Sequence, residues 1–195
     1  MIDRETLLTL IPHQGAMCLW DEVVEWDARR IRLRAQNHRD PSHPLRSDDR
    51  LRAVHLCEYG AQAMAVHGGL RAREGGGKAP PGMLVALRGI ALHVARIDDL
   101  PGALEGEAEV LVEAEGSQQY AFRILHAGTL LAEGRAATGR RDTSSASTKL
   151  ITTPSATVLP IARSTGIDDS ASRLNTSRVI RLHTISACRV RSWSA

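Results

Sequence analysis

The chain has 195 residues, of which 43% are apolar, so its length and composition suffice for one folded domain with additional residues to spare. Aromatic residues make up only 3%, so a core must consist mainly of aliphatic side chains. The three cysteines show no CxxC spacing, which indicates neither a disulfide framework nor a metal site. The N-terminus lacks a secretory pattern, and no segment reaches the roughly 18 apolar residues of a membrane span. We therefore expect a cytoplasmic protein that does not enter a membrane.

The formal net charge of +3 is unevenly distributed along the chain. Residues 142–195 contain seven of the 25 Lys and Arg residues but only three of the 22 Asp and Glu residues. Residues 1–141 are therefore nearly neutral. This balance gives no support for nucleic-acid binding by the part of the chain that can fold.

The first 50 residues predict a short helix followed by a hairpin. Residues 5–10 predict a helix that ends before Pro12, and residues 17–26 and 29–35 predict two strands. Apolar residues and arginines alternate along the second strand, which is typical of a half-buried strand. Residues 37–50 are polar and contain two prolines, so they predict a loop.

Residues 51–70 predict a helix that is apolar almost all round and ends at or soon after Gly68–Gly69. Such a helix is usually buried on most sides, and the small side chains of Ala61 and Ala63 should face close neighbours. A glycine- and proline-rich stretch follows. Four further strands are then predicted, at 83–95, 103–114, 118–126 and 129–138.

This order predicts an α+β domain over residues 1–141, in which an antiparallel sheet wraps around one long central helix. A two-layer domain with the helix on one open face is the alternative. From residue 142 the chain becomes rich in Ser and Thr and loses its apolar periodicity. Residues 142–195 are therefore predicted to be a disordered tail. A basic recognition tail and a reading-frame accident are the other interpretations.

Candidate chemistry centres on a polar loop and the helix after it. Glu58 lies in the otherwise small and apolar helix, and Gln62 follows four residues later, so both side chains share one helix face. His43 precedes Pro44 in the loop. A buried carboxyl group and a nearby imidazole could act as an acid–base pair. The competing interpretation is a Glu that faces water beside loop histidines without a role.

Three segments give the chain a resemblance to a known family: LIPHQGAMCLWDEVVEWD (10–27), NHRDPSHPLRSDDRL (37–51) and AVHLCEYGAQAMAVHGGL (53–70). They resemble the hotdog-fold 3-hydroxyacyl-(acyl carrier protein) dehydratases, most closely the branch associated with aryl polyene and related fatty-acid or polyketide pathways. The resemblance covers roughly residues 5–139. It implies a hotdog fold and a dimer, either a homodimer or a heterodimer with a hotdog paralogue.

The resemblance also implies roles for individual residues. His43 matches the family base and Glu58 the family acid, and the two groups would meet across a dimer interface. Pro44 directly follows His43 where the family has an aromatic residue and then Pro, and Arg52–Ala53 replaces the family's Pro-Gly at the helix entry. Ala53 or Val54 would offer a backbone N–H to the enolate oxygen, and Gln62 would support substrate binding.

The remaining histidines carry weaker expectations. His38 is a rival base in the same loop. His55 precedes Glu58 by three residues and is expected to be structural or supporting. His13 is expected to shape the substrate tunnel or to pack.

Three functions follow from these residues. The first is dehydration of a 3-hydroxyacyl thioester to a trans-2-enoyl thioester. The second is a non-catalytic subunit that pairs with an active paralogue, and the third is acyl thioester hydrolysis. No cofactor is expected, because the substrate would arrive on the phosphopantetheine of an acyl carrier protein.

Overall fold

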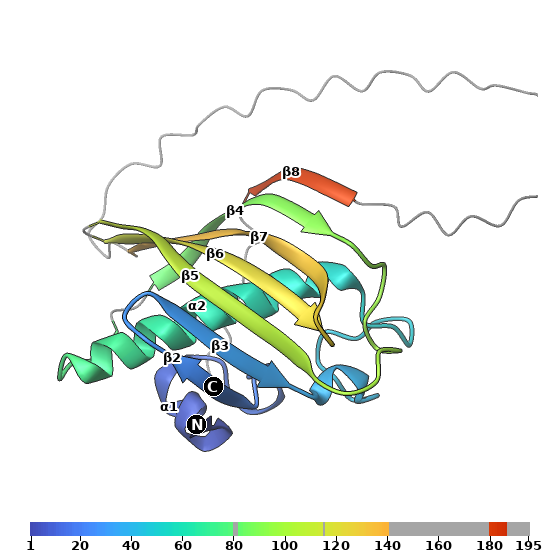
Figure 1. Cartoon of the computed structure of the whole chain (residues 1–195), viewed down its shortest axis with the longest axis horizontal. Coiled ribbons are helices and arrows are strands. Elements are labelled where there is room, and N and C mark those ends of the chain that lie inside the picture. Colours follow the sequence, from blue (N-terminus) through green and yellow to red (C-terminus); the bar gives the residue numbers. More distant parts are fainter. Residues whose placement is uncertain (80–81, 115, 141–179, 187–195) are drawn as a thin grey trace, which may run out of the picture. The chain divides into compact units, whose positions relative to one another are not determined.

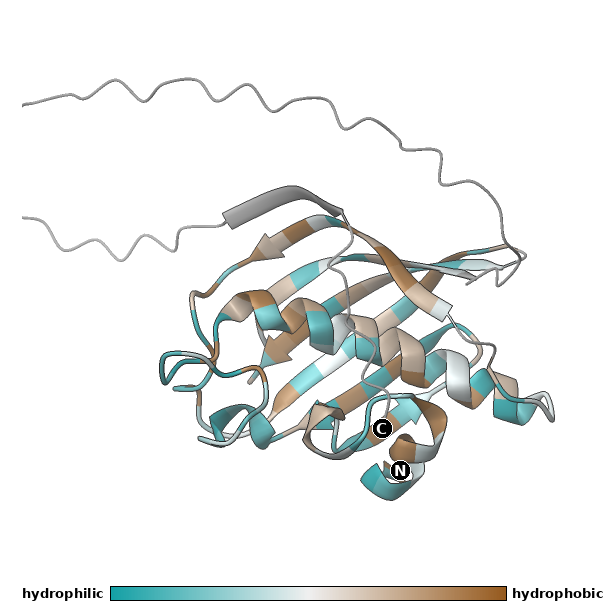
Figure 2. Ribbon diagram, turned by 180° about the vertical axis from the view of Figure 1, so that it is seen from behind, coloured by the Kyte–Doolittle hydropathy of each residue, from teal (hydrophilic) through white to brown (hydrophobic). Residues whose placement is uncertain are grey.

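The computed structural model describes residues 1–79, 82–114, 116–140 and 180–186. Within these residues one long helix lies across one face of a single antiparallel sheet (Figures 1 and 2). The helices are α1 (Arg4–Leu10) and α2 (Leu56–Glu74), with short 3-10 turns at Gly15–Met17, Asn37–Arg39 and Ala53–His55. The strands are β1 (Ile2–Asp3), β2 (Glu22–Trp26), β3 (Arg30–Ala35), β4 (Gly82–Leu92), β5 (Leu104–Ala114), β6 (Ser117–His126), β7 (Thr129–Arg140) and β8 (Ile180–Ser186).

The strands follow the spatial order β1-β2-β3-β5-β6-β7-β4-β8, and every neighbouring pair is antiparallel. The register of β3 against β5 shows why the alternating sequence forms this sheet. The apolar side chains of β3, such as Ile31 opposite Ala108, are buried on the face of the sheet that α2 covers. Its arginines lie opposite the glutamates of β5, for example Arg32 opposite Glu107. Opposite charges on paired strands stabilise this outer face modestly.

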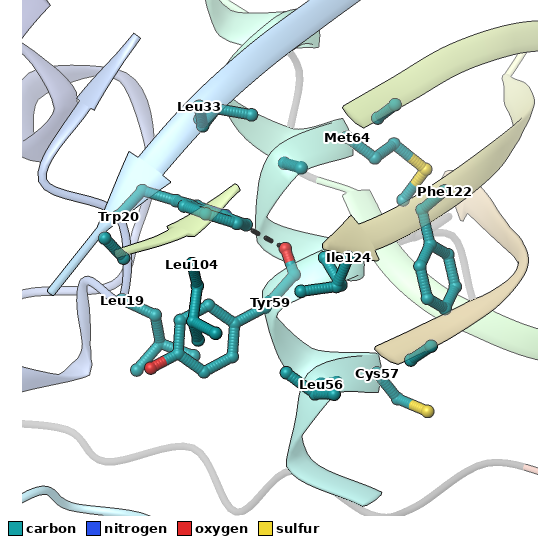
Figure 3. Close-up of a cluster of buried hydrophobic side chains, with 14 of the residues drawn as sticks. Leu19, Trp20, Leu33, Leu56, Cys57, Tyr59, Met64, Leu104, Phe122 and Ile124 are labelled. Atoms are coloured by element: carbon teal, nitrogen blue, oxygen red, sulfur yellow. Dashed lines mark hydrogen bonds between the residues drawn. The ribbon is translucent and has the colours of Figure 1, made fainter. Parts of the chain in front are cut away.

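Two glycines allow aromatic rings to pack closely in the core. A Cβ atom at Gly60 of α2 would lie 2.5 Å from the Phe122 ring of β6, and one at Gly106 of β5 would lie 2.2 Å from Trp20. Both aromatic rings are therefore accommodated only because these positions lack a side chain. Trp20 also donates a 2.9 Å hydrogen bond from its indole N–H to the Tyr59 carbonyl, which ties the segment before β2 to α2 (Figure 3).

Several sequence predictions are confirmed, and three need correction. The first predicted strand begins at Glu22 rather than residue 17, because the Leu19 N–H is bound by the Gln62 side chain instead of a neighbouring strand. The glycine pair does not end α2. A Cβ atom at Gly69 would lie 3.0 Å from Leu10, so this glycine allows α1 to approach. Ala63 is buried as predicted, whereas Ala61 is only half-buried.

The predicted tail lies mostly outside the described residues. Its described part is the strand β8, which pairs with the outer edge of β4. Nothing in the described part tests the predicted boundary at residue 141. None of the described helices is both long and apolar enough to span a membrane.

Candidate functional site

Glu58 lies in the first turn of α2, where a negative charge interacts favourably with the helix dipole. Its side chain is 33% exposed, in contrast to the buried residues that flank it on the helix, Cys57 and Tyr59. Burial raises the pKa of the Cys57 thiol to about 11, so that residue remains a protonated thiol near neutral pH. The reactive group that α2 presents at this point is therefore the carboxyl group.

Gln62 holds this carboxyl group in place. The predicted i to i+4 pairing is present, since Gln62 Nε2 donates to Glu58 Oε1 at 3.1 Å. The same amide nitrogen donates to the Met17 carbonyl at 2.9 Å, and the amide oxygen accepts from the Leu19 N–H at 2.9 Å. Gln62 is fully buried. Its hydrogen bonds make it a rigid support for Glu58 rather than a group that is free to bind substrate.

The imidazole next to Glu58 within the chain is His13. Its Nε2 lies 3.4 Å from Glu58 Oε1, and its side chain is 31% exposed. His13 follows α1 in the first of the three segments that carry the resemblance. Its contact with the carboxyl group was not predicted, because residues 13 and 58 are joined by no local sequence pattern.

His43 is buried among other hydrogen-bonding groups. The Leu45 N–H donates to His43 Nδ1 at 3.2 Å, so in the neutral ring Nε2 carries the proton and donates to the Tyr59 hydroxyl at 3.1 Å. The Tyr59 hydroxyl in turn donates to Asn37 Oδ1 at 2.8 Å. Burial lowers the pKa of His43, and the nearby His55 lowers it further. His43 is thus held neutral with both ring nitrogens in use.

The chain does not bring the two predicted catalytic residues into contact. His43 packs against Tyr59, whereas Glu58 faces His13 and Gln62. Tyr59 directly follows Glu58 on α2, and the side chains of adjacent helix residues point about 100° apart. His43, which contacts Tyr59, therefore lies on a different side of the helix from the Glu58 carboxyl group. The expectation that His43 and Glu58 meet across a dimer interface concerns two subunits, and it stays a prediction.

The other loop histidine, His38, is fully buried and donates from Nε2 to the Leu100 carbonyl at 3.0 Å. Its Nδ1 is buried without a hydrogen-bond partner among the described residues. Burial lowers its pKa. His55, in the turn before α2, also has a pKa lowered by burial and by Arg52, partly offset by Glu58. His55 is therefore an electrostatic neighbour of the carboxyl group.

The two candidate donors for an enolate oxygen differ. The Ala53 N–H donates to the Ala95 carbonyl at 3.0 Å, and its predicted role toward substrate stays a prediction. No hydrogen bond from the Val54 N–H to another described residue is present, and Val54 is exposed. Val54 is therefore the remaining backbone candidate at the entry to α2.

Two grooves on the described part of the chain lie away from these side chains. A groove of about 600 Å³ is lined by residues such as Asp3, Trp26 and Leu70, and another of about 530 Å³ lies between α1 and the end of α2. Neither is lined by His43 or Glu58. The described residues also contain no group of three or more His, Cys, Asp or Glu side chains arranged to hold a metal ion.

A long helix crossing one antiparallel sheet is the architecture of the hotdog proteins. The model of the ApeP-like family, described as ApeP dehydratase, matches residues 5–149. The chain therefore belongs to the ApeP-like dehydratase family, which confirms the resemblance seen in the sequence. A comparison with curated proteins found no match.

Comparison with solved structures confirms the hotdog fold. The chain is similar to a component of the dehydratase heterocomplex ApeI:P from Xenorhabdus doucetiae, with 24% identity and a TM-score of 0.63 over 70% of this chain and 91% of that chain. It is also similar to an HP0420 homologue from Helicobacter felis, with 10% identity and a TM-score of 0.51 over 71% of this chain and 87% of that one. At these identities the likeness establishes the fold alone.

Proposed function

We propose that the chain is a subunit of a 3-hydroxyacyl-thioester dehydratase and that Glu58 supplies its catalytic carboxyl group. The observation that carries the proposal is the placement of Glu58, a partly exposed carboxyl group at the start of the buried central helix, fixed through Oε1 by Gln62. Membership of a dehydratase family supports the reaction type. The substrate would be a 3-hydroxyacyl group on the phosphopantetheine of an acyl carrier protein, in fatty-acid or aryl polyene-type synthesis.

The reaction requires two proton transfers. A base removes a proton from C2 of the acyl chain, and the electron pair forms the C2–C3 double bond. The C3 hydroxyl leaves as water after it accepts a proton from an acid. Glu58 in its protonated form can be that acid, and an imidazole is suited to be the base near neutral pH. The Val54 N–H can stabilise the developing negative charge on the thioester oxygen.

The site would be completed by a second subunit. Neither groove described above is lined by Glu58, which supports an acyl-chain tunnel formed between this surface and that of a second subunit. In a homodimer the base would be His43 of the second copy, as the family resemblance implies. Association with a hotdog paralogue is the heteromeric form of the same arrangement, and a heterocomplex is what the structural relative from Xenorhabdus doucetiae is named for.

The hydrogen bonds of His43 favour a second candidate function. Because Nδ1 accepts from Leu45 and Nε2–H donates to Tyr59, His43 offers no free lone pair in this arrangement. A subunit of this kind would contribute Glu58 or the tunnel wall, while an active paralogue supplies the base. This function differs from the first in requiring the paralogue for any turnover.

Dehydration of a carrier-bound 3-hydroxyacyl thioester, followed by mass spectrometry, tests the proposal. The protein is assayed alone and mixed with a hotdog paralogue, each time as wild type, Glu58→Gln and the surface control Glu109→Gln. We expect Glu58→Gln to lose activity by about 10²–10⁴-fold and Glu109→Gln to keep it. Turnover only in the mixture identifies the second candidate function. Full activity of Glu58→Gln in both assays would contradict a catalytic role for this carboxyl group.

A further inference from the structure

The contacts of Glu58 are strongly asymmetric between its two oxygens. Gln62 donates to Oε1 at 3.1 Å, and His13 Nε2 lies 3.4 Å from the same oxygen. No described residue donates a hydrogen bond to Oε2. Oε1 is therefore held by the Gln62 hydrogen bond and lies in contact with the His13 ring, whereas Oε2 has no partner among the described residues.

His13 is held in place by the turn that follows α1. The Gln14 side-chain amide donates to the carbonyls of Leu8 and Ile11, at 2.9 and 3.3 Å. These two hydrogen bonds cap the C-terminal end of α1. Arg4 donates to the Gly15 carbonyl at 3.0 Å from the other side of the turn. The imidazole is thus carried by a segment with fixed hydrogen bonds on both flanks, and it can restrict the movement of Glu58.

A second observation concerns which ring nitrogen of His13 carries the proton. Its Nδ1 is buried and has no hydrogen-bond partner among the described residues. A proton on Nδ1 would be a buried donor without an acceptor, which is unfavourable by about 1–3 kcal/mol. A proton on Nε2 avoids that buried donor and lies on the nitrogen that is 3.4 Å from Glu58 Oε1. In this tautomer the N–H lies on the side of the ring that contacts Glu58, and the contact is electrostatic rather than a hydrogen bond.

We infer that His13 is a positioning residue, which together with Gln62 fixes Glu58 Oε1 so that Oε2 is presented to the substrate. His13 does not touch the reacting atoms in this arrangement. It limits the rotation of the carboxyl group about its last side-chain torsion, a torsion that is otherwise broad. The inference rests on the proposed function only in assigning substrate to Oε2, since the anchoring of Oε1 is a property of the chain itself.

Two substitutions at residue 13 separate positioning from packing. The amide nitrogen of His13→Gln can occupy the place of Nε2 and keep a donor near Glu58. The shorter His13→Asn places its amide near the position of Nδ1, too far to reach Oε1. Both replace the ring by a smaller amide, so a loss caused only by packing would appear in both variants. His126 lies at the C-terminal end of β6, and His126→Asn is the control for the loss of a partly exposed histidine.

Kinetics in the active assembly, with or without a paralogue, give the first test. We expect His13→Asn to lower kcat about 10–100-fold with KM changed less than about threefold, because misplacement of a catalytic group lowers turnover. We expect His13→Gln to stay within about threefold of wild type. If Glu58→Gln is inactive but His13→Asn has wild-type kcat, the positioning role is contradicted while the proposed function stands.

Crystal structures of both variants give a test that needs no activity. In His13→Asn we expect the Glu58 carboxyl group to occupy more than one orientation or to turn away from Gln62, and in His13→Gln to remain as in the wild type. A single unchanged Glu58 orientation in His13→Asn would overturn the inference. That result would be decisive even if the protein had no dehydratase activity.

Discussion

Replacement of Gln62 by Met should destabilise the protein and loosen Glu58 at the same time. The substitution nearly preserves side-chain volume but removes three hydrogen bonds, to Leu19, Met17 and Glu58. The Leu19 N–H is fully buried and would lose its partner, at about 1–3 kcal/mol. The Met17 carbonyl and Glu58 are partly accessible to water and should add less. We expect a total loss of about 2–4 kcal/mol in the free energy of unfolding.

Equilibrium unfolding in urea measures this change, with circular dichroism as the signal and the wild-type slope retained. For a domain of this size the loss corresponds to a decrease of about 5–15 °C in Tm. Gln36→Met is the matched control, because Gln36 is exposed and its side chain makes no hydrogen bond among the described residues. The control should change stability by less than about 0.5 kcal/mol. A similarly small effect of Gln62→Met would refute the interpretation that this amide holds the segment before β2 onto α2.

Other predictions concern packing, pH and the C-terminal strand. Ala63→Leu should lower stability by about 1–3 kcal/mol through overpacking, and half-buried Ala61→Leu by less; equal losses in chemical denaturation would contradict the described faces of α2. Burial lowers the pKa of His38 and His43 below 6.5, so the unfolded chain binds more protons and stability should fall as the pH decreases through 6.5 toward 5. Thermal unfolding that is unchanged between pH 7 and 5 would show that these rings are not held neutral. Removal of residues 143–195 should leave Tm nearly unchanged but uncover the β4 edge and increase self-association in size-exclusion chromatography, whereas loss of soluble protein would show that the removed part is needed for folding.

Much of the architecture follows from local patterns in the sequence. The alternation in β3 and β5 identifies their buried faces, because side chains in a strand point alternately to opposite sides. The apolar character of residues 56–70 predicts that α2 is buried against the sheet. The i to i+4 spacing of Glu58 and Gln62 predicts the contact between their side chains. These are relationships between residues that are close in the chain.

The remaining features depend on residues that are distant in sequence. The helix was expected to end at or soon after Gly68–Gly69, but it continues to Glu74, and Gly69 accommodates Leu10, 59 positions away. The Tyr59 hydroxyl that engages His43, and the contact of His13 with Glu58, likewise join segments that no periodicity links. A histidine in a polar loop can be a free base or a buried donor, and only its partners decide between the two.

Mixing two inactive variants tests most directly whether the carboxyl group and the imidazole act together across a subunit interface. His43→Gln keeps a donor for Tyr59 but cannot accept the C2 proton, and Glu58→Gln cannot donate to the hydroxyl. When equal amounts are unfolded and refolded together, half of the dimers should contain both variants, and each of these should have one intact site out of two. We predict that dehydration returns to about a quarter of the wild-type rate. A mixture that remains as inactive as either variant alone would contradict a site shared between two copies of this chain.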